Sequence, residues 1–266
     1  QHSEFIDQFI DGMKSEKFAF IPDLRAILSQ AGEKLEKLLE EGKIRTILNY
    51  LLTDAGLNYS QLPKAVLAFH WGDGKARTPI EAHIDEGIAY AEGKNGQVNI
   101  HFTISPQFEN HFSEMIKQAL ATKDGLADHI TITWSYQKEE TQTVAVKPDN
   151  QLFKLPNGKI LFRPGGHGAL IENLNDLEAD IIYIKNIDNV VVHDKSDDVN
   201  RYKRILGGYL FEVKERVFAY LERLALGADR LSDQALEEIV TFCAAIHVEF
   251  QPDFQQLPKT DRIERL

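Results

Sequence analysis

The side chains best suited to bind a ligand lie between positions 161 and 192. Gly165, Gly166, His167 and Gly168 follow a short apolar run and precede leucines at helical spacing. Glycines allow positive φ angles and a close approach of a ligand, and a helix that begins after them offers unpaired N–H groups to an anion. These residues are therefore the candidate nucleotide-binding loop, although a tight strand-to-helix turn without a ligand would have the same pattern.

An acidic residue and an amide follow the next apolar run, at Asp188 and Asn189. We expect 181–184 to form a short buried strand, and open α/β sheets bind ligands beyond the carboxyl ends of their strands. Because Mg²⁺ prefers oxygen ligands that it shares with phosphates, Asp188 is the candidate metal ligand, and Asn189 is a candidate substrate-binding residue. The alternative is an Asp-Asn pair that only forms a turn.

The strands and helices expected around these residues alternate along the chain. Strands are expected at 65–69, 98–105 and 130–137, and helices at 80–91 and after Pro106. This order predicts an α/β fold of Rossmann-like type, with a mixed, mostly parallel sheet and helices on both faces.

The chain is long enough for one large domain with a helical extension. Four segments are expected in order: a helical segment that packs on the core, an α/β nucleotide-binding core, a helical continuation of the same domain, and a loose tail. Their bounds are 1–58, 59–195, 196–250 and 251–266.

The amino-acid composition limits the classes of molecule that the protein is expected to bind. A net charge of −11 argues against nucleic acid, because its phosphates need a basic surface. The single cysteine, Cys243, excludes a disulfide framework and a cysteine zinc site, which favours a reducing, cytoplasmic compartment. The sequence shows no signal peptide, and no apolar run approaches the roughly 20 residues of a membrane span, so a membrane is not an expected partner. An oligomeric state is not predicted.

Two motifs carry a resemblance to a known family. PGGHGAL at 164–170 and IKNIDNV at 184–190 resemble the UDP-sugar and UDP-N-acetylglucosamine pyrophosphorylases, and most closely a bacterial domain-of-unknown-function branch of that nucleotidyltransferase superfamily. The resemblance implies a glycosyltransferase-A-type sheet. It also implies a reaction that joins a sugar 1-phosphate to a nucleoside triphosphate and releases pyrophosphate, with Mg²⁺ as cofactor.

The resemblance assigns roles to two further residues. Pro63-Lys64 is similar to a Pro-Lys pair whose lysine neutralises the nucleotide phosphates, which makes Lys64 the candidate catalytic residue. Gln137 is similar to the glutamine that reads the uracil edge, and an amide offers the donor and acceptor that this edge requires. Both residues would also be ordinary as exposed surface side chains.

One element of the resembled family is missing. Residues 1–60 contain no strand followed by a glycine-rich loop. Either that loop lies upstream of Gln1, or the chain does not bind a triphosphate in the usual way. A non-catalytic module that binds a nucleotide or nucleotide-sugar is therefore the alternative function, and a scaffold that recruits a partner is a third.

Overall fold

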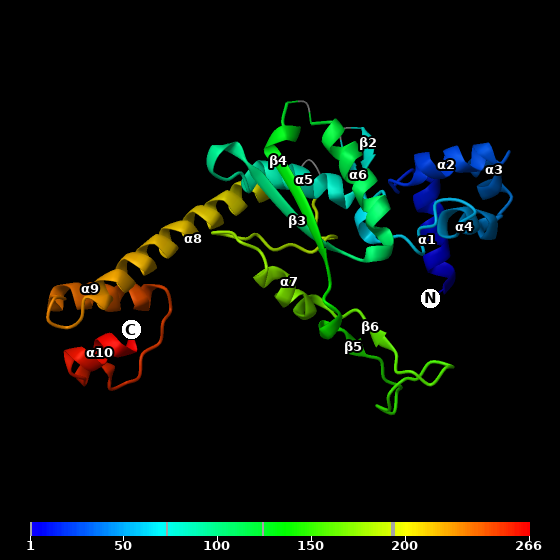
Figure 1. The fold of residues 1–266 in the computed structure, drawn as a ribbon. Helices are drawn as coiled ribbons and strands as arrows, with labels where there is room; N and C mark the ends of the chain where they lie inside the picture. Colours follow the sequence, from blue (N-terminus) through cyan, green and yellow to red (C-terminus); the bar gives the residue numbers. More distant parts are fainter. Residues whose placement is uncertain (1, 73, 124, 193–194) are drawn as a thin grey trace. The chain divides into compact units, whose positions relative to one another are not determined.

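The computed structural model of the protein describes residues 2–72, 74–123, 125–192 and 195–266. The chain divides into two compact units, Gln1–Tyr202 and Lys203–Leu266 (Figure 1). No helix among the described residues is both long and apolar enough to cross a membrane.

The first unit begins with short amphipathic helices whose leucine and isoleucine side chains share one core. Leu24, Leu28, Leu38 and Ile47 are almost completely buried there. Spacings of three and four residues place these side chains on one face of each helix. The helices are α1 (His2–Lys14), α2 (Ile21–Gln30), α3 (Leu35–Glu40) and α4 (Ile44–Leu52).

The centre of the first unit is a parallel pair of strands with two helices packed on it. The alternation at 98–105 and 130–137 predicted two strands, and they form as β3 (Val98–Ile104) and β4 (Ile130–Tyr136), which pair over their whole length. Helix α6 (Glu109–Ala121) connects the strands, and α5 (Pro79–Tyr90) contacts both α6 and β3.

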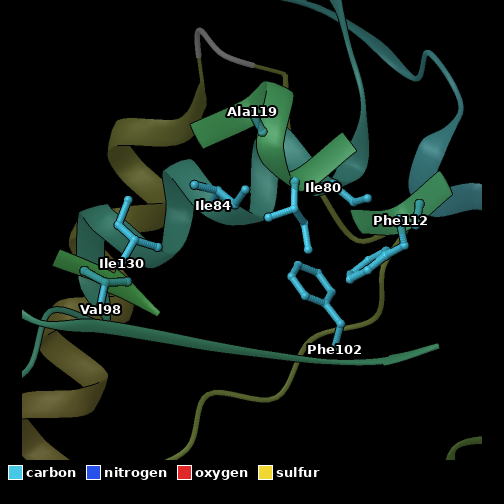
Figure 2. Close-up of a cluster of buried hydrophobic side chains, with 9 residues drawn as sticks. Ile80, Ile84, Val98, Phe102, Phe112, Ala119 and Ile130 are labelled. Atoms are coloured by element: carbon cyan, nitrogen blue, oxygen red, sulfur yellow. The ribbon is translucent and has the colours of Figure 1, made fainter. Parts of the chain in front are cut away.

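Alternate residues of β3 and β4 bury their side chains against α5 and α6. Figure 2 shows Val98 and Ile130 beside Ile84, and the ring of Phe102 close to that of Phe112. The two rings are 5.0 Å apart at 75°, an edge-to-face geometry that aromatic pairs favour. This core fixes α5, which in turn carries the contacts that position the candidate site.

Helix α5 begins where its sequence specifies a start. Thr78 accepts a hydrogen bond from the Glu81 backbone N–H, and the Glu81 side chain accepts from the Thr78 N–H, which is a complete capping box. Pro79 occupies the first helical position, where its missing N–H has no consequence.

The predicted Rossmann-like α/β fold, with a mixed, mostly parallel sheet and helices on both faces, is wrong. The sheets of the described residues have two strands each. Besides β3–β4 they are the antiparallel pairs β1 (His70–Gly72) with β2 (Lys75–Arg77) and β5 (Thr143–Val144) with β6 (Phe162–Arg163).

Two of the expected strands do not form, which removes the larger sheet. The run at 65–69 begins in a 3₁₀ helix, η1 (Lys64–Val66), and 181–184 has no regular secondary structure. Ala65 packs into the β3–β4 core, whereas Ile184 is 70% exposed. A short apolar run indicates that a segment can pack on a half-buried surface, but it does not specify a partner strand. Tertiary contacts therefore determine whether such a run forms a strand.

The second unit is helical. It contains the C-terminal part of α8 (Ser196–Ala225), followed by α9 (Asp233–Ala245) and α10 (Lys259–Arg265). Residues 251–266, expected to be a loose tail, contain α10 and the buried side chain of Phe254, which is 2% exposed. The guanidinium of Arg262 lies 5.3 Å from the centre of the Phe254 ring, a cation–π contact.

Candidate functional site

Two of the predicted site residues, 124 positions apart, are in direct contact. Lys64 Nζ donates a hydrogen bond to Asp188 Oδ2 at 2.5 Å. Lys64 begins η1 directly after the extended Pro63, and the two side chains are 63% and 39% exposed. The site is therefore open to solvent, and it presents one cation and one anion.

Charge around Asp188 keeps its carboxyl group ionised. The hydrogen bond from Lys64 lowers the pKa of Asp188 most, followed by the residue's own backbone N–H and the positive charge of Lys64. The positive charge of a protonated His167 lowers the pKa of the same carboxyl group least of these causes, which is consistent with a glycine-rich loop within electrostatic range of Asp188.

Side-chain contacts hold the segment around Asp188, although it is not a strand. His83 Nε2 lies 3.1 Å from the carbonyl oxygen of Ile187, and His70 Nε2 lies 3.3 Å from that of Val190. A carbonyl can only accept, so both rings carry a proton on Nε2. The contacts come from α5 and β1, and they fasten the chain on both sides of Asp188.

A buried ion pair anchors the same segment three residues before Asp188. Glu86 on α5 is 5% exposed and pairs with Lys185, whose side chain is 10% exposed. Tyr90 also donates a hydrogen bond to Glu86 at 3.1 Å. Burial, followed by the Glu86 charge, raises the pKa of Tyr90 and keeps it a donor.

The glycine-rich loop leads into a 3₁₀ helix, η6 (His167–Leu170), and then α7 (Ile171–Asn175). Sequence reasoning invoked positive φ angles here, but none of Gly165, Gly166 and Gly168 has one. A Cβ atom on Gly165 would lie 2.6 Å from that of Ala169, whereas Cβ atoms on Gly166 and Gly168 would have no neighbour within 4 Å. Close packing therefore requires Gly165, and the other two leave an open main-chain surface.

Gln137 lies against this loop. A Cβ on Gly165 would be 3.5 Å from Gln137 Nε2, which donates to Thr141 Oγ1 at 3.0 Å. Asn189, in contrast, is exposed, and its backbone N–H closes a turn onto Asn186 at 3.0 Å. Lys64 and Asp188 therefore lie toward the His167 end of the glycine-rich loop, whereas Gln137 lies beside Gly165 at its beginning.

Sequence reasoning missed the polar residues that hold α7 in place. Asn173 is 5% exposed and donates to Ser135 Oγ at 2.9 Å and to the Tyr136 carbonyl at 2.8 Å. His101 Nε2 lies 2.9 Å from Ser135 Oγ, and its Nδ1 lies 2.8 Å from Thr133 Oγ1. The signal was present, because strand alternation places these strand residues on the face opposite the apolar core.

The site could take Mg²⁺ only together with a ligand. Among the residues that the structure describes, no group of three or more His, Cys, Asp and Glu side chains is placed to hold a metal ion. Mg²⁺ is commonly held by one or two carboxylates together with ligand phosphates and water. The ionised Asp188 fits that pattern, and it does not fit a tightly held resident ion.

The glycine geometry predicts different effects of alanine at neighbouring positions. Gly165→Ala is expected to lower the free energy of unfolding by about 1–3 kcal/mol, because the added methyl group overlaps Ala169. Gly166→Ala, at φ −77°, is expected to leave it unchanged or slightly raised. Urea denaturation of both variants measures this, and equal effects would contradict the role of close packing at Gly165.

Asp188 should titrate below an ordinary aspartate. A carboxyl group whose pKa is lower in the folded state favours folding above its unfolded pKa of about 3.9, and that contribution disappears as the pH falls through the folded value. Carbon-13 NMR of the Asp188 carboxyl group should give a midpoint below 3.9, and Lys64→Ala should raise it. A midpoint that Lys64→Ala leaves unchanged would show that the two side chains do not interact in solution.

Comparison with known proteins gives a family. Residues 1–266 match the family model described as "Domain of unknown function (DUF4301)". No curated protein and no solved structure matches the chain. The match spans the whole chain and confirms the expectation of a domain of unknown function, and it gives no evidence of a relationship to the nucleotide-sugar pyrophosphorylases. The chain therefore belongs to the DUF4301 family.

Proposed function

We propose that the protein is a nucleotidyltransferase of the nucleotide-sugar pyrophosphorylase type, which joins a sugar 1-phosphate to a nucleoside triphosphate and releases pyrophosphate. The observation that carries the proposal is the meeting of Lys64 and Asp188 within reach of the His167 loop. The sequence resemblance supports the same residues, and the proposal does not depend on the Rossmann-like sheet, because side-chain contacts hold the Asp188 segment.

In this reaction a sugar phosphate oxygen forms a bond to the α-phosphorus, and the bond from that phosphorus to the pyrophosphate oxygen breaks. The attacking oxygen is already anionic, so the site needs no general base. It needs alignment and positive charge on the phosphates. Lys64 supplies a fixed positive charge. Mg²⁺ bound with the triphosphate, at Asp188, would spread the charge that develops on the leaving group.

Other residues would hold the nucleoside. The open main chain at Gly166 and Gly168 allows a flat ring to approach without meeting a side chain. The Gln137 amide next to Gly165 can donate and accept at a base edge. Asn189 is exposed beside Asp188, where it can reach a sugar hydroxyl.

Phosphates must displace the contact between Lys64 and Asp188. Exposed ion pairs contribute little to stability, since water screens them and the long side chain loses rotamer freedom. A triphosphate can therefore take over the lysine at little cost, and this releases the carboxylate for a metal ion.

The second candidate function is a module that holds a nucleotide or nucleotide-sugar without turnover. Two observations favour it: Asp188 already pairs with Lys64, and among the described residues no three His, Cys, Asp and Glu side chains are grouped to hold a metal ion. Such a site can bind a nucleotide, but it offers little to orient two reacting phosphates.

Pyrophosphate release distinguishes the two functions. Purified protein is mixed with UTP or ATP, Mg²⁺ and a panel of sugar 1-phosphates, and pyrophosphate is followed by phosphorus-31 NMR. The enzyme should release pyrophosphate only when a sugar 1-phosphate is present, and Asp188→Asn should stop it. A rise in melting temperature with nucleotide but without pyrophosphate would favour the module. If no nucleotide or nucleotide-sugar raised the melting temperature, both functions would be excluded.

A further inference from the structure

A cavity of about 220 Å³ lies immediately beyond the Asp188 segment. Its wall includes Val190, two residues after Asp188, together with Trp71 from β1, Glu86 from α5 and Asn200 from α8. Residue ranges that are far apart in the sequence thus enclose one space, and none of the predicted site residues lines it.

The size of the cavity limits what it can hold. Sites for drug-sized ligands are about 300–1,000 Å³. At about 220 Å³ the cavity is too small for a whole nucleotide and suits a single ring with its substituents.

The polar lining favours hydroxyl groups over an anion. Three carboxylates, Asp85, Glu86 and Asp197, line the cavity with a single guanidinium, that of Arg77. Arg77 and Lys123 both pair with Asp85. The cations described at this wall are already engaged, Arg77 and Lys123 with Asp85 and Lys185 with Glu86, so they are not placed to bind a phosphate, whereas hydroxyl groups can donate to carboxylate oxygens.

Asn200 provides an independent sign of a ligand. Its Oδ1 atom is buried and has no hydrogen-bond partner among the residues that the structure describes. A buried acceptor without a donor is unfavourable, and such orphans in native structures call for an explanation. Asn200 lines the cavity, and a rotation of its amide toward that space would let a ligand hydroxyl supply the missing donor.

An aromatic surface completes the lining. Phe69 and Trp71 both face the cavity, and Trp71 is 37% exposed. Binding pockets combine such apolar surfaces with a few polar groups that fix the orientation of the ligand. A sugar ring matches this combination, because its C–H face is apolar and its edge carries hydroxyl donors.

We propose that this cavity binds the ring of the sugar 1-phosphate, with its phosphate outside the cavity and toward Lys64 and Asp188. The inference rests on the proposed function and assigns its acceptor subsite. Two residues of chain span at most about 7 Å, so Asp188 lies within that distance of the cavity wall at Val190. The ring sits among carboxylates, and the anionic group lies beside the lysine.

Tryptophan fluorescence tests the subsite. The chain has two tryptophans, so Trp134→Phe leaves Trp71 as the only one. In that background, glucose 1-phosphate or N-acetylglucosamine 1-phosphate should change the Trp71 emission saturably, and inorganic phosphate should not. Saturation-transfer NMR should show contact at the ring protons of the bound sugar phosphate. An equal response to inorganic phosphate, or no response in either measurement, would overturn the inference.

The variant Asn200→Leu distinguishes a role of Asn200 in ligand binding from a role in stability. It removes the orphaned acceptor at similar size, so the variant should melt at the same or a higher temperature while its affinity for the sugar phosphate falls about tenfold. Asn110→Leu, at an exposed position on α6, is the matched control and should leave affinity unchanged. An unchanged affinity in Asn200→Leu would contradict the proposed role of Asn200.

A separate measurement distinguishes an error in the sugar subsite from an error in the proposed function. Binding of UTP with Mg²⁺ is measured by calorimetry on the same proteins. If UTP binds and no sugar phosphate does, the subsite is refuted and the nucleotide site stands. If UTP does not bind, the proposed function itself is refuted.

Discussion

Replacing Lys64 by alanine is expected to weaken the binding of UTP with Mg²⁺ by about 10- to 100-fold. A hydrogen bond to a charged group contributes about 1.5–3 kcal/mol, and each 1.4 kcal/mol corresponds to a factor of ten in affinity. Lys64 is the cation in contact with Asp188, and its 63% exposed side chain is free to turn toward a ligand. Isothermal titration calorimetry measures the change directly.

The control for Lys64→Ala must remove the same charge elsewhere. Lys117 is an exposed lysine on α6, away from the Lys64–Asp188 pair in the sequence, and Lys117→Ala should change the affinity less than twofold. If both variants lost affinity equally, the effect would come from net charge and not from the site. A third variant, Asp188→Asn, should lose the Mg²⁺ dependence of binding, since Asp188 is the proposed metal ligand.

The largest effect on stability is expected from the buried pair under the site. Glu86→Ala should lower the free energy of unfolding by about 3–5 kcal/mol, because it leaves Lys185 charged and buried without its partner. Chemical denaturation followed by circular dichroism gives the value. The same variant should weaken nucleotide binding, since Lys185 anchors the segment that carries Asp188.

A double variant shows whether the pair acts as a unit. Glu86→Leu with Lys185→Met replaces both charges by apolar groups of similar size and should recover most of the lost stability. Comparison with the two single variants in a double-mutant cycle gives the interaction energy. A loss below 1 kcal/mol in Glu86→Ala, or no recovery in the double variant, would show that the pair does not anchor this segment.

The elements with a long, regular pattern were predictable from the sequence. Strict alternation identified β3 and β4, and the Thr78-Pro79 start identified α5. Runs of four or five apolar residues did not specify a strand. Ala65 found its place in the core from a 3₁₀ helix, and Ile184 is largely exposed. The larger sheet was inferred from such short runs, and for that reason it was wrong.

The contacts that bring the candidate residues together could not be predicted from the sequence. The prediction placed Asp188 at the carboxyl end of a strand, but His83, His70 and the Glu86–Lys185 pair hold its segment instead. These contacts join residues 99 to 120 positions apart, and no local pattern encodes such distances.

The role of the glycines in the glycine-rich loop also differs from the predicted one. Positive φ angles and a close approach of a ligand were the expected reasons for the three glycines. None of them has a positive φ, and Gly165 is required by the nearby Ala169 Cβ and by the Thr141 carbonyl oxygen, 3.2 Å from a Cβ at Gly165. Packing of this kind depends on Thr141, which precedes the loop by more than twenty residues. The sequence alone therefore marked the loop but not the role of each glycine.

The proposed function requires that the glycine-rich loop and Asp188 bind one ligand together. Nitrogen-15 NMR with UTP and Mg²⁺ measures this, because each backbone N–H reports its own surroundings. We expect the amide signals of Gly166, Gly168, Asp188 and Asn189 to shift together with a single dissociation constant, and Lys64→Ala to weaken the binding that all of them report. Shifts confined to one of the two segments, or none at either, would contradict it.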